Sequence, residues 1–413
     1  MKPHLRTAGN AAERQPVRTD ILAHGPGAPR VLLVGDHFGY PGGVAHGVTS
    51  YHLNVLPMLA AAGVSFLACF LRSSHPLARQ LTDAGIELKF LNSGKWSPSV
   101  VGRVLKIARK YRPDVVHTIG MKSCVIGRIA ARATKAAAII HVHDLDVPPL
   151  ILRLLYQTLA HPSDVGMSVS SAVAAQVPAS YRISAMRNVV LHNGIDRRPF
   201  QIGDSEAAAN RRRLLQLGPD SPVVGMVARF HPDKGHPEMF EIFLRVSRAL
   251  PQARLALVGD GPTLPESKAM VAAMGLSDRV LFLGQRSDVP QLMSCFDLVA
   301  VPSRTEGLGF AAIEAFAAAR PVVAFGVDGL VDIIRDREDG YLISPGDVEG
   351  FASAVVSLLN DSTQRGDFGA RGAERSRYFD VAEHVRRLVG VYCHLADPRH
   401  RFGAFRIEEA PVR

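Results

Sequence analysis

Residues 302–315 read Pro-Ser-Arg-Thr-Glu-Gly-Leu-Gly-Phe-Ala-Ala-Ile-Glu-Ala and directly follow the apolar run 298–301. An apolar run, then glycines, then an alanine-rich segment predict a buried strand, a tight loop and a helix. Gly307 and Gly309 let the backbone approach a ligand closely. A helix that begins near Gly309 points free N–H groups and a positive dipole at any phosphate there. The stretch therefore predicts a ligand-binding loop at the carboxyl end of a strand.

Two glutamates belong to this stretch. Glu306 lies in the predicted loop, where its carboxylate can accept hydrogen bonds from sugar hydroxyls. Glu314 lies about a turn and a half into the predicted helix and can hold a ribose diol, as an acidic residue does in other Rossmann sites. A helix cap at Glu306 and a surface carboxylate at Glu314 are the structural alternatives, and the neighbouring glycines favour a binding role.

A second informative stretch covers residues 225–236 and reads Gly-Met-Val-Ala-Arg-Phe-His-Pro-Asp-Lys-Gly-His. A predicted strand ends at Ala228, so Arg229 and Lys234 lie in the loop that follows it, where ligands of parallel sheets bind. A forked guanidinium and a compact ammonium suit a diphosphate. They would also stabilise the negative charge on a departing nucleoside diphosphate. The alternative is an exposed loop whose cations bind nothing.

Outward from these stretches, short apolar runs alternate with amphipathic segments along most of the chain. This alternation predicts parallel sheets covered by helices on both faces. The turn signal Asn-Gly-Ile-Asp at 193–196 divides it into two series, which predicts an α/β fold with two Rossmann-like doubly wound domains facing a central cleft. We expect strands at 30–35, 64–70, 87–91, 114–118, 138–143, 165–170 and 188–192, and then at 223–228, 254–258, 280–283, 298–301 and 322–325.

The length of 413 residues fits two domains better than one core. We expect these domains at 29–198 and 199–378. Residues 379–395 are expected to form a helix that packs back on the first domain. Residues 1–28 are expected to form a flexible polar tail and residues 396–413 a second tail.

The net charge of +10 is concentrated in one segment, because residues 101–135 carry nine Lys or Arg and one acid, Asp114. Such a segment can face anionic lipid or an anionic acceptor, or it can be a solvated helix surface. An apolar stripe from Val100 to Ala108 and the apolar stretch 149–159 can each be an interfacial helix. Packing on the sheet is the favoured interpretation of both. No nucleic-acid partner is expected.

The first 28 residues lack the apolar centre of a secretory signal, and no apolar run is long enough for a membrane-spanning helix. The four cysteines are widely spaced, as is typical of reduced thiols. We therefore expect a cytoplasmic protein, with peripheral contact to the inner face of the membrane as an option.

The first series also contains candidate site residues. Gly42 and Gly43 lie in a glycine-rich loop before a predicted helix, which suits donor phosphates or an acceptor; an ordinary strand-to-helix turn is the alternative. His143 ends the predicted strand 138–143 and can move a proton near neutral pH or donate a hydrogen bond. His141 is expected to point to the opposite side of that strand, and His117 is a weaker candidate.

The two glutamates, in the form Glu-Gly-x-Gly-x-x-x-x-Glu-Ala, resemble the signature of retaining glycosyltransferases of the GT-B architecture, especially glycosyltransferase family 4. The segments 193–196, 257–262, 280–284 and 297–303 are similar to other parts of that family in the same order. The resemblance covers most of residues 30–395.

This resemblance implies metal-independent transfer of a hexose-like unit, with retention, from a nucleoside diphosphate sugar, and it implies no cofactor. The acceptor would be a glycan, a lipid-linked sugar or a small molecule bound by the first domain, in polysaccharide or glycoconjugate biosynthesis. His143 resembles, by position, an active-site histidine of the first domain. The implied donor contacts are Arg229 and Lys234 on the diphosphate, Glu306 on the sugar, the backbone of Gly309 and Phe310 on the phosphate, and Glu314 on the ribose.

One motif departs from the family pattern, because the usual Gly-Gly-x-x-Glu reads Asp-Gly-Leu-Val-Asp at 328–332. The contacts of this loop are therefore expected to differ. Two other functions stay open for the whole chain. One is a sugar-nucleotide epimerase of the same fold, and the other is a non-catalytic carbohydrate-binding relative.

Overall fold

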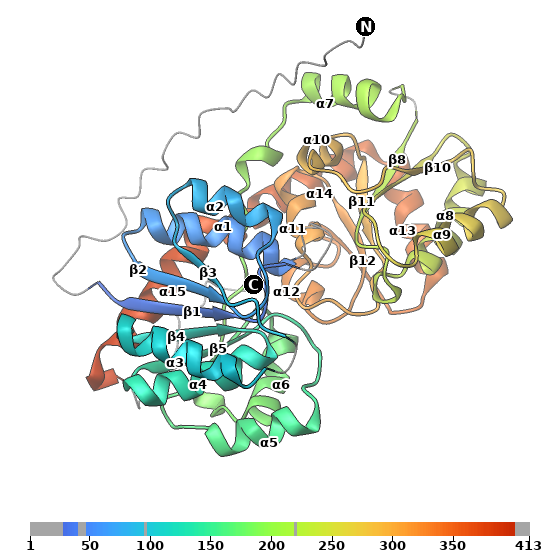
Figure 1. The fold of residues 1–413 in the computed structure, drawn as a ribbon. Helices are drawn as coiled ribbons and strands as arrows, with labels where there is room; N and C mark the ends of the chain where they lie inside the picture. Colours follow the sequence, from blue (N-terminus) through green and yellow to red (C-terminus); the bar gives the residue numbers. More distant parts are fainter. Residues whose placement is uncertain (1–27, 40–46, 95–96, 219–220, 401–413) are drawn as a thin grey trace, which may run out of the picture.

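The computed structural model describes residues 28–39, 47–94, 97–218 and 221–400, and it contains two α/β domains (Figure 1). The first is built on seven parallel strands, β1 (Arg30–Gly35), β2 (Ser65–Phe70), β3 (Leu88–Phe90), β4 (Val115–Ile119), β5 (Ala137–Val142), β6 (Val165–Ser168) and β7 (Asn188–Val190). Their spatial order is β3-β2-β1-β4-β5-β6-β7. The order therefore reverses between β1 and β4, and the crevice beyond this point is a ligand site in such sheets.

Helices cover both faces of this sheet because successive residues of each strand point to opposite sides. In β1, Val31 and Leu33 pack toward α1, whereas Leu32 and Val34 pack toward α3 and α4. All four side chains are buried, which explains the continuous apolar run in the sequence. The helices of this domain are α1 (Gly47–Ala61), α2 (Arg79–Asp83), α3 (Ser99–Tyr111), α4 (Met121–Thr134), α5 (Leu150–Leu159) and α6 (Ser171–Tyr181).

The second domain has six parallel strands in the order β10-β9-β8-β11-β12-β13, so β8 and β11 flank its switch point. The strands are β8 (Val223–Val227), β9 (Arg254–Val258), β10 (Val280–Phe282), β11 (Leu298–Val301), β12 (Val322–Phe325) and β13 (Gly340–Ile343). The helices are α7 (Asp204–Asn210), α8 (His236–Ala249), α9 (Leu264–Ala273), α10 (Val289–Ser294), α11 (Phe310–Ala317), α12 (Leu330–Ile333), α13 (Val348–Asn360) and α14 (Ser362–Arg375). The prediction of two Rossmann-like doubly wound sheets is confirmed.

The chain crosses between the domains twice, and the two crossings run side by side. Ile195 donates its N–H to the carbonyl of Phe379 and accepts from the N–H of Val381, both at 2.9 Å. The last helix, α15 (Val381–Ala396), then packs on α1 and β4 of the first domain. Its Tyr392 hydroxyl lies 2.6 Å from Nδ1 of His117.

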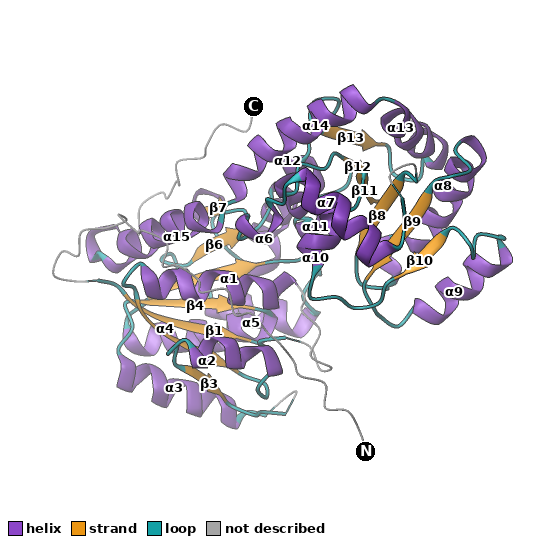
Figure 2. Cartoon of the chain, turned by 90° about the horizontal axis from the view of Figure 1, so that it is seen from above, coloured by secondary structure: helices purple, strands orange, loops and turns teal. Residues whose placement is uncertain are grey.

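Seen from above, α6 of the first domain faces α11 and α12 of the second (Figure 2). The carboxyl ends of both sheets therefore meet near this junction. Within the described ranges, no helix is both long and apolar enough to cross a membrane.

Candidate active site

The two stretches that the sequence singled out meet at the carboxyl ends of β8 and β11, which are neighbours in the sheet. Nζ of Lys234, from the loop after β8, donates to Oε1 of Glu306, from the loop after β11, at 2.9 Å. The hydroxyl of Ser303 donates to the same oxygen at 2.9 Å. A cation and a carboxylate 72 positions apart in sequence thus form one polar centre.

Gly235 makes this close approach of the two loops possible. Its φ is +71°, a left-handed conformation that favours glycine. A side-chain carbon at this position would overlap the carbonyl oxygen of Pro302 at the start of the neighbouring loop. The dipeptide Lys-Gly is the sequence signal for this contact.

Arg229 lies half-buried in the same loop. Among the described residues, its guanidinium has no hydrogen-bond or ion-pair partner, and the side chain acts on Asp233 only as a nearby charge. An arginine held in a partly desolvated position without a carboxylate is suited to an anionic ligand.

Helix α11 begins at this site. Its N-cap is Gly309, with a φ of +104° and no side chain to accept from the first N–H groups. These donors and the helix dipole favour an anion. The ring of Phe310 lies against Gly47 of α1, since a Cβ built there would be 3.3 Å from the ring. The start of α11 therefore borders the first domain.

Glu314 lies in the second turn of α11 and is half-buried. Burial raises the pKa of its carboxyl to about 7. No side chain among the described residues hydrogen-bonds or pairs with this carboxyl group. It can therefore accept hydrogen bonds from a ligand hydroxyl when it is ionised, or donate one when it is protonated.

His143 belongs to the first domain but lies at the same place. Its carbonyl oxygen abuts the backbone of Gly307, where a side-chain carbon would overlap it. Nδ1 of His143 lies 3.3 Å from Nδ2 of Asn193, while Nε2 is buried and has no partner in the described structure. Burial lowers the pKa of His143 to about 3. The imidazole is therefore neutral near pH 7, which favours hydrogen bonding over proton transfer.

The expected orientation of His141 is wrong. Residues two positions apart in an extended chain point to the same side, so His141 and His143 share a side although β5 itself ends at Val142. The rings of His141 and His143 lie 4.0 Å apart, centre to centre. His141 is buried, and its Nδ1 lies 3.0 Å from Nε2 of His117. His141 and His117 thus form part of a buried cluster beneath His143.

Both aspartates of the altered motif at 328–332 make contacts that the sequence did not predict. Oδ2 of Asp328 accepts from the N–H of Glu306 at 3.1 Å and so supports the loop that carries this glutamate. Oδ2 of Asp332 reaches the first domain. It accepts from the N–H and hydroxyl of Ser171 at 2.6 and 3.0 Å, and it lies 3.1 Å from Nε2 of His192.

Asp332 therefore caps α6 across the domain junction. Burial acts to raise its pKa, but the hydrogen bonds from His192 and Ser171 outweigh this effect and hold the pKa below its usual range. An anion at a helix N-terminus is favourable. Gly42 and Gly43 lie outside the described residues, so their predicted role stays a prediction.

Two family models match the chain, one in each domain. The model described as Glycosyltransferase Family 4 matches residues 45–198, and the model described as Glycosyl transferases group 1 matches residues 221–361. The two matches together cover most of both domains.

Named relatives include D-inositol 3-phosphate glycosyltransferase of Mycobacterium marinum, 33% identical over 305 residues, which covers 68% of this chain and 62% of the relative. Another is the Escherichia coli UDP-Gal:alpha-D-GlcNAc-diphosphoundecaprenol alpha-1,3-galactosyltransferase, 26% identical over 276 residues, with 62% and 69% covered. The chain spans less than two thirds of the length of the Mycobacterium marinum relative.

Solved structures share the fold. Anabaena Alr3699/HepE in complex with UDP has a TM-score of 0.76 at 23% identity, with 88% of this chain and 99% of that chain covered. A glycosyltransferase from Rickettsia africae has a TM-score of 0.79 at 19% identity, with 90% and 99% covered. With both domains matched and this architecture, the chain belongs to glycosyltransferase family 4 and has the GT-B fold.

Proposed function

We propose that the chain is a retaining glycosyltransferase that transfers a hexose-like unit from a nucleoside diphosphate sugar to a glycan, glycolipid or small-molecule acceptor. The observation that carries this proposal is the contact of Lys234 with Glu306 at 2.9 Å. A cation suited to phosphate and a carboxylate suited to sugar hydroxyls thus lie side by side at a sheet switch point, which supports the proposal. We further propose a cytoplasmic role in polysaccharide or glycoconjugate biosynthesis.

The donor site is assigned to the second domain. The diphosphate would lie between Lys234, Arg229 and the start of α11, where three sources of positive potential converge. The carboxyl of Glu314 would hold the ribose, and Glu306 would contact the sugar. UDP is the first nucleotide to test, because a structural neighbour binds UDP and the Escherichia coli relative is named for UDP-Gal.

The proposed reaction breaks the bond between the anomeric carbon and the phosphate oxygen and forms a bond to the acceptor oxygen on the same face. The acceptor proton passes to the departing phosphate oxygen, so no dedicated base is needed. Lys234 and Arg229 stabilise the charge that grows on the diphosphate, and we propose that they do so without a metal. His143, neutral near pH 7, donates a hydrogen bond from Nε2 to the donor sugar.

A screen of UDP, GDP, ADP and their sugars by thermal shift, followed by product analysis, tests this function. We expect one donor to raise the melting temperature and its sugar to appear on an acceptor with the anomeric configuration kept. Release of nucleotide and rearranged sugar from the donor alone would indicate the epimerase instead. A chain that binds none of these nucleotides would be a non-catalytic relative.

A further inference from the structure

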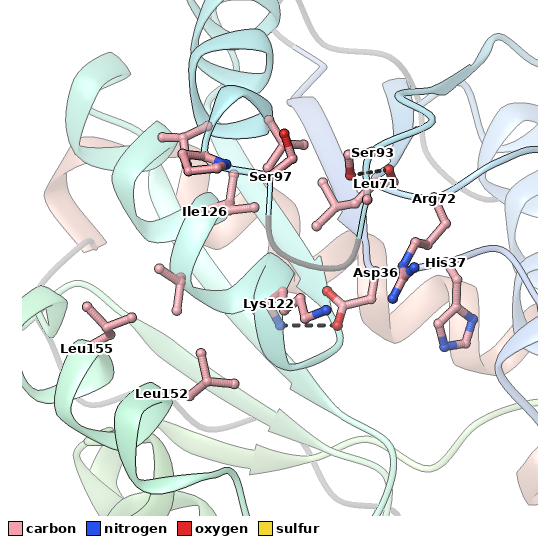
Figure 3. A pocket seen from close by; sticks show the side chains of 15 residues that line it. Asp36, His37, Leu71, Arg72, Ser93, Ser97, Lys122, Ile126, Leu152 and Leu155 are labelled. Carbon is pink, nitrogen blue, oxygen red and sulfur yellow. Dashed lines mark hydrogen bonds between the residues drawn. The ribbon is translucent and has the colours of Figure 1, made fainter.

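A pocket of about 290 Å³ lies in the first domain, beyond the carboxyl ends of β1 and β2 (Figure 3). The loops after β1, β2 and β3, the starts of α3 and α4, and one side of α5 form its walls. It lies in the domain opposite the proposed donor site, where the acceptor would enter under the proposed function.

The two ends of this pocket differ in chemistry. Asp36, His37, Arg72 and Lys122 gather at one end, and the leucines of α5 lie at the other (Figure 3). Leu71, Pro98, Val100, Val101, Val125 and Ile126 add to the apolar wall. Such a pocket matches a molecule with a polar head and an apolar chain.

The polar end favours an anionic head. The carboxylate of Asp36 is engaged with the start of α4, since it accepts from the N–H groups of Ser123 at 2.6 Å and Lys122 at 3.1 Å. Arg72 is half-buried, and among the described residues its guanidinium has no hydrogen-bond or ion-pair partner. Burial lowers the pKa of His37, so this neighbour is uncharged near pH 7. Arg72 is therefore available to a phosphate group.

The apolar end continues onto the protein surface along α5. Leu152 and Tyr156 pack inward, whereas Leu150 and Ile151 are 69% and 59% exposed on the other side of the same helix. Leu155 lines the pocket and is itself partly exposed, so the pocket wall and the exposed face are continuous. Large exposed apolar side chains gathered on one helix indicate a binding surface.

The charge of the neighbouring helices indicates which kind of partner this surface binds. Helices α3, α4 and α5 pack side by side on one face of the sheet (Figure 1). The apolar stripe of α3 is buried, as the packing interpretation predicted, while Lys106, Arg109 and Lys110 are exposed. Exposed apolar side chains on α5 and exposed cations on α3 therefore belong to helices on the same face of the sheet, a combination that suits an anionic bilayer. A second copy of the chain would instead bring like charges together.

We propose that the acceptor is a membrane lipid with a phosphate-bearing head. The phosphate binds Arg72, and the acyl or prenyl tail of the lipid runs along Leu152 and Leu155. The protein docks on the bilayer through Leu150 and Ile151. This inference deepens the proposed function and rests on it for the transfer step. The binding step stands on the geometry of the first domain alone.

Dodecyl phosphate, which combines the head and the chain, tests the pocket directly. In calorimetric titrations of the full chain, we expect it to bind at least about ten-fold more tightly than inorganic phosphate or the uncharged dodecyl maltoside. Arg72→Gln should weaken the binding of dodecyl phosphate by about ten-fold or more and leave the affinity for dodecyl maltoside unchanged. Equal affinity for the charged and uncharged amphiphiles, or no effect of Arg72→Gln, would overturn the assignment of an anionic head.

Vesicle sedimentation tests the docking surface. Vesicles of phosphatidylglycerol and phosphatidylcholine in equal parts should bind the wild type at low salt, and the double variant Leu150→Ser, Ile151→Ser should bind about ten-fold less. Both side chains are exposed, so the variant should fold normally. Gln157→Ser, an exposed polar position of the same helix, is the matched control and should bind as the wild type does. Equal binding by all three proteins, or no binding, would contradict the membrane role.

Titration of the same proteins with UDP separates the two proposals. If UDP does not bind but dodecyl phosphate binds through Arg72, the donor assignment fails and the lipid site stands. If UDP binds and a soluble sugar is glycosylated but dodecyl phosphate does not bind, the proposed function stands and the lipid acceptor is wrong.

Discussion

Replacing Glu314 with glutamine should make the protein more stable at alkaline pH while it weakens nucleotide binding. The carboxyl group has an ordinary pKa of 4.5, and burial raises it to about 7 in the folded chain. Between these values the folded protein retains a proton that the unfolded chain has released, so the free energy of unfolding falls as the pH rises. Above pH 7 the carboxyl group is ionised in both the folded and the unfolded state, and the folded protein then bears the full free-energy cost of burying a charged Glu314.

The size of this penalty follows from the difference between the two pKa values. One pKa unit corresponds to about 1.4 kcal/mol, so the carboxylate costs at most about 3 kcal/mol above pH 7. Solvent screening of the half-buried side chain reduces this value, and we expect about 1 to 3 kcal/mol. Glutamine has nearly the same shape and carries no charge. The variant should therefore gain this amount at pH 8 and only a small part of it at pH 5.

Urea denaturation at pH 5 and pH 8, followed by circular dichroism, measures the difference in free energy of unfolding between variant and wild type. Glu266→Gln, at an exposed position of α9, controls for the loss of one negative charge. The affinity for UDP should fall by about ten-fold in Glu314→Gln because a charged hydrogen-bond acceptor for the ribose is lost. The same stability difference at both pH values would refute the role of burial, and unchanged affinity would remove Glu314 from the ribose site.

Three further substitutions test other parts of the structure. Lys234→Ala should lower kcat/KM by about a hundred-fold or more without changing the circular dichroism spectrum; near-normal transfer would contradict the diphosphate role. Gly235→Ala should cost about 2 kcal/mol or more in thermal unfolding, because the new carbon meets the carbonyl of Pro302 and φ is positive; an unchanged melting temperature would show that the loops can separate freely. Asp332→Asn should cost about 1.5 to 3 kcal/mol above pH 3.8, the unfolded pKa, and less as the pH falls through the lowered folded value; a loss that does not depend on pH would argue against its charge.

The sheets were predictable because parallel strands are buried on both faces and leave continuous apolar runs. Strand β13 and helix α14 were missed. Helix α14 contains Gly366, Gly369 and Gly372, which disfavour a helix by propensity. The last of these lets the helix approach Phe316 of α11, since a Cβ at Gly372 would lie 2.6 Å from that ring. Tertiary packing therefore overrides local preference at α14.

Lys234 and Glu306 come together because they lie in the loops that follow β8 and β11, which are neighbours at the switch point. The contacts of Ser303, Asp328 and Asp332 could not be read from one sequence, since serines and aspartates are common in loops and their partners depend on the fold. Asp332, for example, reaches Ser171 across 161 positions. The sequence also could not show which residues of the apolar stretch 149–159 pack on the sheet and which are exposed, because apolar side chains occupy both sides of this helix.

Calorimetric titration of the wild type and Lys234→Ala with UDP, GDP and ADP shows whether the loop after β8 binds a nucleoside diphosphate. We expect one of these nucleotides to bind the wild type at a single site, and we expect Lys234→Ala to weaken this binding by about ten-fold or more. Equal affinity in both proteins, or no binding of any of the three, would contradict the claim that this loop holds a diphosphate.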